Sequence, residues 1–115
     1  LVGSEMCIRD RRKDFWANVH IPGGTEEMNQ TLEYATRVAD YLDLGELMCV
    51  DALDRDESCG AHYRDDHLSE DGEAERDDDN WCFVSAWEPN GENKFIRHSE
   101  PLYFDRIPLM TRNYK

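Results

Sequence analysis

The chain has 115 residues, enough for one small domain, and its 26 acidic and 13 basic residues give a net charge of −13. So acidic a chain repels phosphates and anionic lipid, which argues against nucleic acid as a partner. Mean hydropathy is −0.83, and no apolar run approaches the roughly 20 residues of a membrane span. A hydrophobic content of 39% predicts a thin core that gains stability by packing on another structure.

The first twelve residues, LVGSEMCIRDRR, show no sustained apolar period. The string looks like a translated library-adapter sequence, so we expect residues 1–12 to be non-native, or else a disordered leader. Residues 13–22 are short and mixed and end in Pro22-Gly23-Gly24, which predicts an extended strap or a short helical turn.

Two helices are expected next. Thr25 suits an N-cap, and the apolar residues after it recur at helical spacing, which predicts an amphipathic helix over about 25–43. Those residues are Met28, Leu32, Ala35, Val38, Ala39 and Leu42. Gly45 is expected to break or kink the chain before a second helix over about 45–56. Residues 13–57 then form a partial helical domain, two antiparallel helices left from a three-helix bundle.

The segment 58–80 lacks a helical or strand period and predicts a long ordered acidic loop. Residues 51–79 hold 13 acidic residues and three basic ones, and an ordered loop of this length is often functional. Residues 81–115 predict a small antiparallel β-hairpin and an extended tail. Its strands are Trp81–Trp87 and Phe95–His98, joined at Pro89-Asn90-Gly91. The expected fold class is therefore α+β.

The residues of this loop could in principle serve a metal site, a nucleophilic pair or a calcium site. The spacing Cys59-x2-His62-x4-His67, with Asp65 or Asp66, matches no closed zinc pattern. A Cys59–His62 nucleophilic pair is disfavoured because the surrounding carboxylates oppose a thiolate. The alternating ligands of a calcium loop are absent. We therefore expect no catalytic, cofactor-binding or metal-binding residue here.

The cations and thiols of the chain favour structural roles. Arg55, Arg64 and Arg76 are the only cations among the carboxylates of residues 51–79. Each can form a bidentate pair that fixes the path of the loop. The four cysteines show neither a secretory signal nor a closely spaced pair, and they predict free thiols in a reducing compartment: Cys7, Cys49, Cys59 and Cys82.

The loop carries E-S-C-G-A-H-x-R-x-D from Glu57 to Asp66, then E-R-D-D-x-N-W from Glu75 to Trp81. This signature resembles the C-terminal segment of the flavoprotein subunit of succinate dehydrogenase and fumarate reductase, E-S-R-G-A-H-x-R-x-D and R-D-D-E-N-W. The resemblance covers about residues 13–115, including the L-G-E-L-M-C-V-D-A-L run at 44–53 and a tail similar to the family's R-x-Y. Cys59 stands where many members of the family have arginine, and the segment 67–75 is longer than the corresponding segment of many members.

The resemblance implies the C-terminal fragment of an oxidoreductase that interconverts succinate and fumarate. FAD is implied for the full-length parent, and its flavin-binding and catalytic residues lie upstream with no matching position here. The implied partners are the N-terminal flavin and capping domains, an iron–sulfur subunit and a membrane anchor, on the cytoplasmic face of the inner membrane. The fragment itself is expected to be inactive.

The residues expected to support interdomain docking are Arg55, Glu57, His62, Arg64, Asp66, Arg76, Asp77 and Trp81. The alternative hypothesis is an independent acidic interaction module whose 65–79 loop binds a basic partner or a metal.

Overall fold

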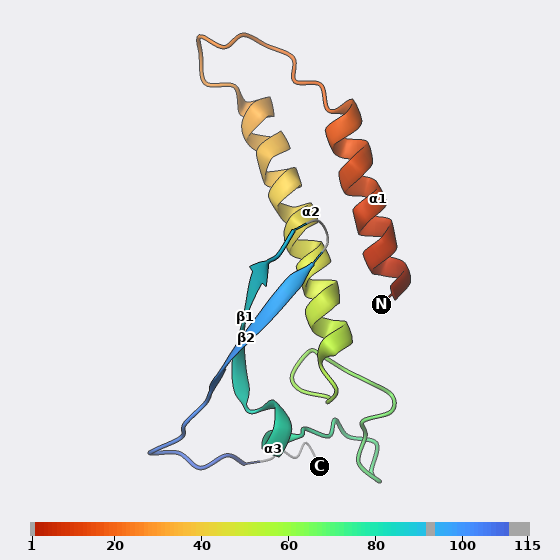
Figure 1. The fold of residues 1–115 in the computed structure, drawn as a ribbon, viewed down its shortest axis with the longest axis vertical. Helices are drawn as coiled ribbons and strands as arrows, with labels where there is room; N and C mark the ends of the chain where they lie inside the picture. Colours follow the sequence, from red (N-terminus) through yellow and green to blue (C-terminus); the bar gives the residue numbers. More distant parts are fainter. Residues whose placement is uncertain (1, 92–93, 111–115) are drawn as a thin grey trace. The chain divides into compact units, whose positions relative to one another are not determined.

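The computed structural model describes residues 2–91 and 94–110. The chain divides into two compact units, Leu1–Asp56 and Glu57–Lys115, and each is described by itself. The first holds helices α1 (Val2–Asn18) and α2 (Gln30–Asp54). The second holds the short helix α3 (Asp78–Trp81) and strands β1 (Phe83–Pro89) and β2 (Phe95–Pro101). The chain thus contains helices and an antiparallel hairpin, which confirms the α+β class (Figure 1).

Helix α1 runs antiparallel to α2 and contacts it along one face (Figure 1). Its half-buried residues recur every three or four positions, which places them on a single stripe of the helix: Glu5, Ile8, Arg9, Arg12 and Phe15. Residues 2–12 therefore lie in a helix, where the sequence predicted no regular structure. The helical period is hidden in the sequence because three of the five inner positions are charged. The non-native origin of residues 1–12 stays a prediction.

Helix α2 differs from the expected pair of helices in two ways. It begins at Gln30, because the Asn29 side chain accepts hydrogen bonds from the N–H groups of Thr31 and Leu32 and so caps the helix. Thr25 is not the N-cap. The helix also continues through Gly45 to Asp54, so the predicted helices 25–43 and 45–56 are one element. A glycine inside a helix costs only about 1 kcal/mol, which tertiary contacts offset.

The face of α2 toward α1 is shifted from the predicted apolar face. Ala39 is buried, and Ala35 and Leu42 are half-buried, as the pattern predicted. Met28 is 98% exposed, however, because it precedes the helix. The antiparallel pair is thus α1 with α2 rather than two halves of residues 25–56. Ala39 is the one buried hydrophobic side chain among the described residues, so the core is as thin as the composition suggests.

The hairpin of the second unit follows the predicted pattern. Strands β1 and β2 are antiparallel, with Phe83 opposite Pro101 and Pro89 opposite Phe95. Gly91 takes the positive φ of +82° that glycine allows at the turn. Strand β1 begins at Phe83, two residues later than expected, because α3 includes Trp81. Residues 102–110 form no helix or strand, and the R-x-Y-like end at 111–115 lies outside the described residues.

Candidate functional site: the 57–81 loop

Two adjacent buried polar residues begin the loop. Glu57 is 2% exposed and Ser58 is fully buried. A Glu57 carboxylate oxygen accepts a 2.9 Å hydrogen bond from the backbone N–H of Asp77. The Ser58 hydroxyl oxygen accepts from the N–H of Arg64 at 2.8 Å and donates to the same residue's carbonyl at 3.2 Å. Buried polar groups need such partners because an unsatisfied one costs about 1–3 kcal/mol.

The backbone of the loop folds back on itself twice. Cys59 and His62 exchange two backbone hydrogen bonds of 2.9 and 3.0 Å, and Gly60 supplies the required turn with φ +60°. A second bridge joins Leu68 to Ala74. The Ser58 N–H donates to the Glu75 carbonyl at 3.0 Å, which ties the start of the loop to its end. The segment is therefore held by its own hydrogen bonds.

Two arginine–aspartate forks repeat with the same geometry. The Nε and Nη2 atoms of Arg64 bind the two carboxylate oxygens of Asp66 at 2.9 and 2.6 Å. Arg76 binds Asp78 at the same two distances. Both pairs are separated by one residue. The guanidinium of Arg64 hydrogen-bonds Asp66 and lowers the pKa of that carboxyl from 3.8 to about 2.

The end of the loop carries a cap and an aromatic stack. Asp77 caps α3, accepting from the Asn80 N–H at 3.1 Å and from its side-chain amide at 2.8 Å. The Arg97 guanidinium carbon then lies 5.2 Å from the Trp81 ring centre and 5.1 Å from that of Phe83. This stack connects α3 to both strands of the hairpin.

Residues 5–114 match the family model described as "Fumarate reductase flavoprotein C-term". The chain belongs to this family. It is a C-terminal domain of succinate dehydrogenase and fumarate reductase flavoproteins, as the Glu57–Trp81 signature suggested. No curated protein and no solved structure matches the chain.

The structure brings most of the expected residues of this flavoprotein domain together. Glu57, His62, Arg64, Asp66, Arg76, Asp77 and Trp81 all take part in the internal bonding of one loop or in its end. Arg55 instead ends α2 in the first unit, where its N–H donates to the Asp51 carbonyl at 3.0 Å. The docking role assigned to the set stays a proposal.

Three contributors were missed from the sequence. Ser58 was placed in the loop and in the signature but given no structural role, yet it is the most buried residue of the loop. Asp78, rather than Asp77, pairs with Arg76. The repeated Arg-x-Asp spacing of Arg64–Asp66 would have identified this pair. Arg97 lies on β2, and no local pattern links it to Trp81 in α3.

Metal-ligating side chains, cysteines and helix hydropathy complete the description of the chain. Within residues 2–91 and 94–110, no three His, Cys, Asp or Glu side chains come together as a metal site. All four cysteines are free thiols. No described helix is long and apolar enough to cross a membrane. The loop is best described as a self-bonded acidic segment.

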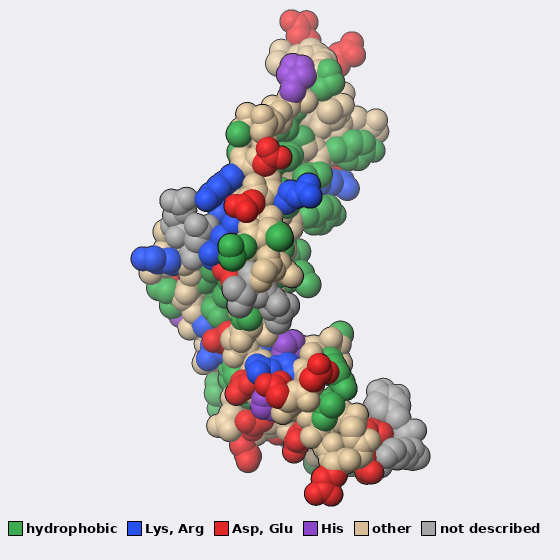
Figure 2. Space-filling view, turned by 90° about the vertical axis from the view of Figure 1, so that its right-hand side faces the viewer, with side chains coloured by type: hydrophobic (Ala, Val, Ile, Leu, Met, Phe, Trp, Pro, Cys, Tyr) green, Lys and Arg blue, Asp and Glu red, His purple; other side chains and the backbone are tan. Residues whose placement is uncertain are grey.

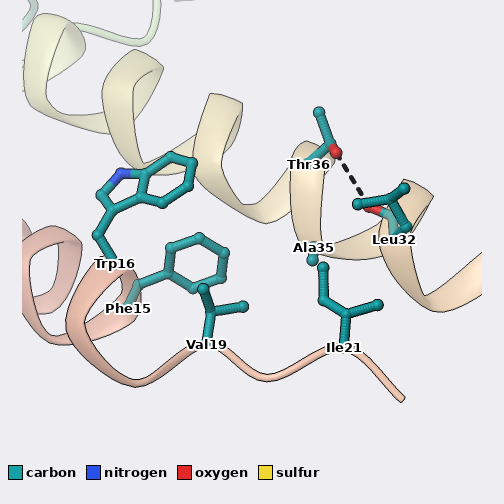
Figure 3. A pocket seen from close by; sticks show the side chains of 7 residues that line it. All are labelled: Phe15, Trp16, Val19, Ile21, Leu32, Ala35 and Thr36. Carbon is teal, nitrogen blue, oxygen red and sulfur yellow. Dashed lines mark hydrogen bonds between the residues drawn. The ribbon is translucent and has the colours of Figure 1, made fainter. Parts of the chain in front are cut away.

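An apolar hollow of about 220 Å³ lies in the first unit, at the end of the helical hairpin where residues 19–29 connect α1 to α2. Figure 3 shows side chains from the end of α1 facing those from the start of α2. Its lining is Phe15, Trp16, Val19, Ile21, Leu32, Ala35 and Thr36. Ligand pockets are commonly about 300–1,000 Å³ with a few convergent polar groups. This hollow is smaller and almost wholly apolar, so its residues do not fit a flavin.

Proposed function

We propose that this domain is a non-catalytic structural part of the FAD-containing subunit of succinate dehydrogenase or fumarate reductase. The observation that supports the proposal most directly is the buried Glu57–Ser58 pair. The side chains of these two signature residues form hydrogen bonds with the backbone of the loop itself. Their chemistry therefore holds a segment in shape, as expected for a docking element and not for a reacting group.

The complete subunit would interconvert succinate and fumarate. FAD, bound by the upstream domains, would supply hydride acceptance and single-electron transfer toward an iron–sulfur subunit and quinone. The complex would lie at the cytoplasmic face of the inner membrane through a separate anchor. In the described residues every buried side-chain nitrogen and oxygen has a hydrogen-bond partner within the chain.

The exposed apolar surface of the first unit supports docking to those upstream domains. Large hydrophobic side chains of the helical hairpin are about half exposed or more, including Trp16 at 63%, Met48 at 63% and Leu32 at 52%. Figure 2 shows hydrophobic side chains at the surface of the helical part of the chain. Exposed patches of this kind commonly mark protein interfaces. We assign this surface to the flavin-containing remainder of the same polypeptide.

The first test is direct. The purified chain should show no flavin absorbance and no dye-linked succinate oxidation. Flavin binding or succinate oxidation by the chain alone would contradict the proposal. Extending the reading frame upstream adds an independent check. An in-frame flavin-binding Rossmann segment is expected, whereas a start codon near Lys13 would favour the acidic interaction module.

The second test uses the complete flavoprotein. Arg64→Ala should lower flavin retention and the midpoint of thermal unfolding, because it removes the fork that shapes the loop. Arg106→Ala changes an exposed arginine of the same unit and serves as the matched control. Equal flavin content and equal thermal stability in both variants would contradict a docking role for the loop.

A further inference from the structure

Glu46 is a charged residue with no solvent exposure, near the middle of α2. One carboxylate oxygen accepts a 2.7 Å hydrogen bond from Nε of Arg9, and the other accepts a 2.6 Å bond from Nη1 of Arg12. Taking a carboxylate out of water costs several kcal/mol unless cations and hydrogen bonds replace the lost solvent. This position of α2 therefore requires a guanidinium-bearing neighbour.

The surroundings of Glu46 orient that neighbour. Arg9 and Arg12 lie three residues apart and so share a face of α1. Arg9 also pairs with Glu5, and Arg12 with Asp43 at 3.1 Å. The hydrogen bond to Glu46 is the largest cause of a raised pKa at Arg9. Each guanidinium is thus held between two carboxylates.

Gly45 adds a steric element next to the charge. A Cβ built on Gly45 would lie 3.5 Å from the Cδ1 atom of Ile8, so the Ile8 side chain rests against the glycine. Ile8 belongs to the same inner stripe of α1 as Arg9 and Arg12. Gly45 thus contacts an isoleucine, and Glu46 beside it binds the arginine that follows, so the charge of Glu46 makes the contact selective.

We infer that the Gly45–Glu46 step of α2 selects an arginine-bearing helix and sets the register in which it docks. The occupant is α1 of this chain. Sliding α1 by one helical turn moves it about 5.4 Å. Because Arg9 and Arg12 lie about one turn apart, the slip leaves at most one guanidinium within reach of Glu46. Apolar contacts tolerate such a slip, but a buried carboxylate that loses one of its two cationic partners does not, and buried polar groups fix helix register in this way. The inference concerns the 115-residue chain whatever the origin of residues 1–12, and it stands without the proposed function.

A double-mutant cycle on the full chain tests the contact. Glu46→Gln and Arg12→Gln should each lower the folding equilibrium constant of the helical hairpin by about tenfold or more. In the double variant, the folding equilibrium constant should fall by a factor that is at least about fivefold smaller than the product of the two single-variant factors. Arg11→Gln, on an exposed position of the same helix, is the control and should change the constant by less than about twofold. Independent, multiplicative losses would overturn the inference.

A second variant separates register from stability. Glu46→Leu replaces the charge with an apolar side chain that the hairpin can bury. The wild-type chain should show one set of nuclear Overhauser contacts between the Ile8 δ-methyl and the Gly45 α-protons. In Glu46→Leu we expect that contact to weaken or split while the helix content is kept. A single unchanged contact in the leucine variant would show that apolar packing sets the register, and would overturn the inference.

Discussion

A carboxylate oxygen of Glu57 accepts a 2.9 Å hydrogen bond from the backbone N–H of Asp77, twenty residues further along the chain. The contact closes the acidic loop at its two ends. It lies next to the bond from the Ser58 N–H to the Glu75 carbonyl. Since Glu57 is 2% exposed, water cannot replace its hydrogen bonds, and the closure of the loop depends in part on this carboxylate.

Replacing Glu57 tests that dependence. Glu57→Gln keeps an acceptor oxygen but loses the charge, so the free energy of unfolding of the second unit should fall by about 1–2 kcal/mol. Glu57→Ala should cost about 2–3 kcal/mol, because the Asp77 N–H loses its partner. Urea unfolding measures both. Glu70→Gln at the exposed loop tip is the control and should stay within about 0.5 kcal/mol of wild type; equal effects at the two positions would contradict the role of Glu57.

The Arg64–Asp66 fork has a defined pH dependence. Because the pKa of Asp66 is lowered from 3.8 to about 2, the pair contributes fully above the unfolded pKa. Its contribution is lost as the pH falls from about 4 toward 2. Carboxyl-carbon NMR titration should show the lowered pKa in the wild-type chain and a return toward 3.8 in Arg64→Gln. Arg76→Gln, which breaks the other fork, should leave Asp66 unchanged; a shift there would mean that the two forks are coupled.

Gly45 offers a substitution that should stabilise the protein. A Cβ added there meets only the flexible end of Ile8 at 3.5 Å, an ordinary van der Waals distance. Gly45→Ala should therefore gain up to about 1 kcal/mol from helix propensity, measured by urea unfolding. Gly60→Ala is the contrasting variant. Its φ of +60° makes a side chain cost about 1–2 kcal/mol. Destabilisation by Gly45→Ala would show that the helices approach more closely at this point.

The Arg97 stack is expected to stabilise the hairpin modestly. Arg97→Ala removes the cation from above Trp81 and Phe83 and should cost about 0.5–2 kcal/mol in urea unfolding. The indole N–H resonance of Trp81 should also move in an NMR spectrum. Arg97→Lys should retain part of the effect because the positive charge stays. Equal changes in unfolding free energy and in the Trp81 resonance for Arg106→Ala and Arg97→Ala would mean that the loss of stability comes from net charge and not from the stack.

The hairpin and the loop were accessible from the sequence because their signals are local. The Asn90-Gly91 pair marks a turn between two strand-like runs, and β1 and β2 lie on either side of it. The absence of any apolar period predicted the loop 58–80. Ser58 was missed because burial of a serine depends on residues far along the chain, such as Glu75.

The helices were predicted less well for a physical reason. The contact between α1 and α2 contains charged residues at positions that are usually apolar: Glu46, Arg9 and Arg12. The apolar pattern of the sequence therefore does not reveal the inner face of α1. Gly45 and Thr25 carried the usual signals for a helix end and a helix start. Packing against α1 and the cap at Asn29 overrode both signals.

The placement of Glu57 and Ser58 also bears on how the protein can be cut. They are the first two residues of the second unit, and Asp56 is the last residue of the first. If the two units are expressed separately or a linker is inserted between them, the boundary should therefore lie between Asp56 and Glu57. A piece that starts at Glu57 keeps every loop bond described above, whereas one that starts at Cys59 discards both buried anchors and leaves the Asp77 amide without its carboxylate.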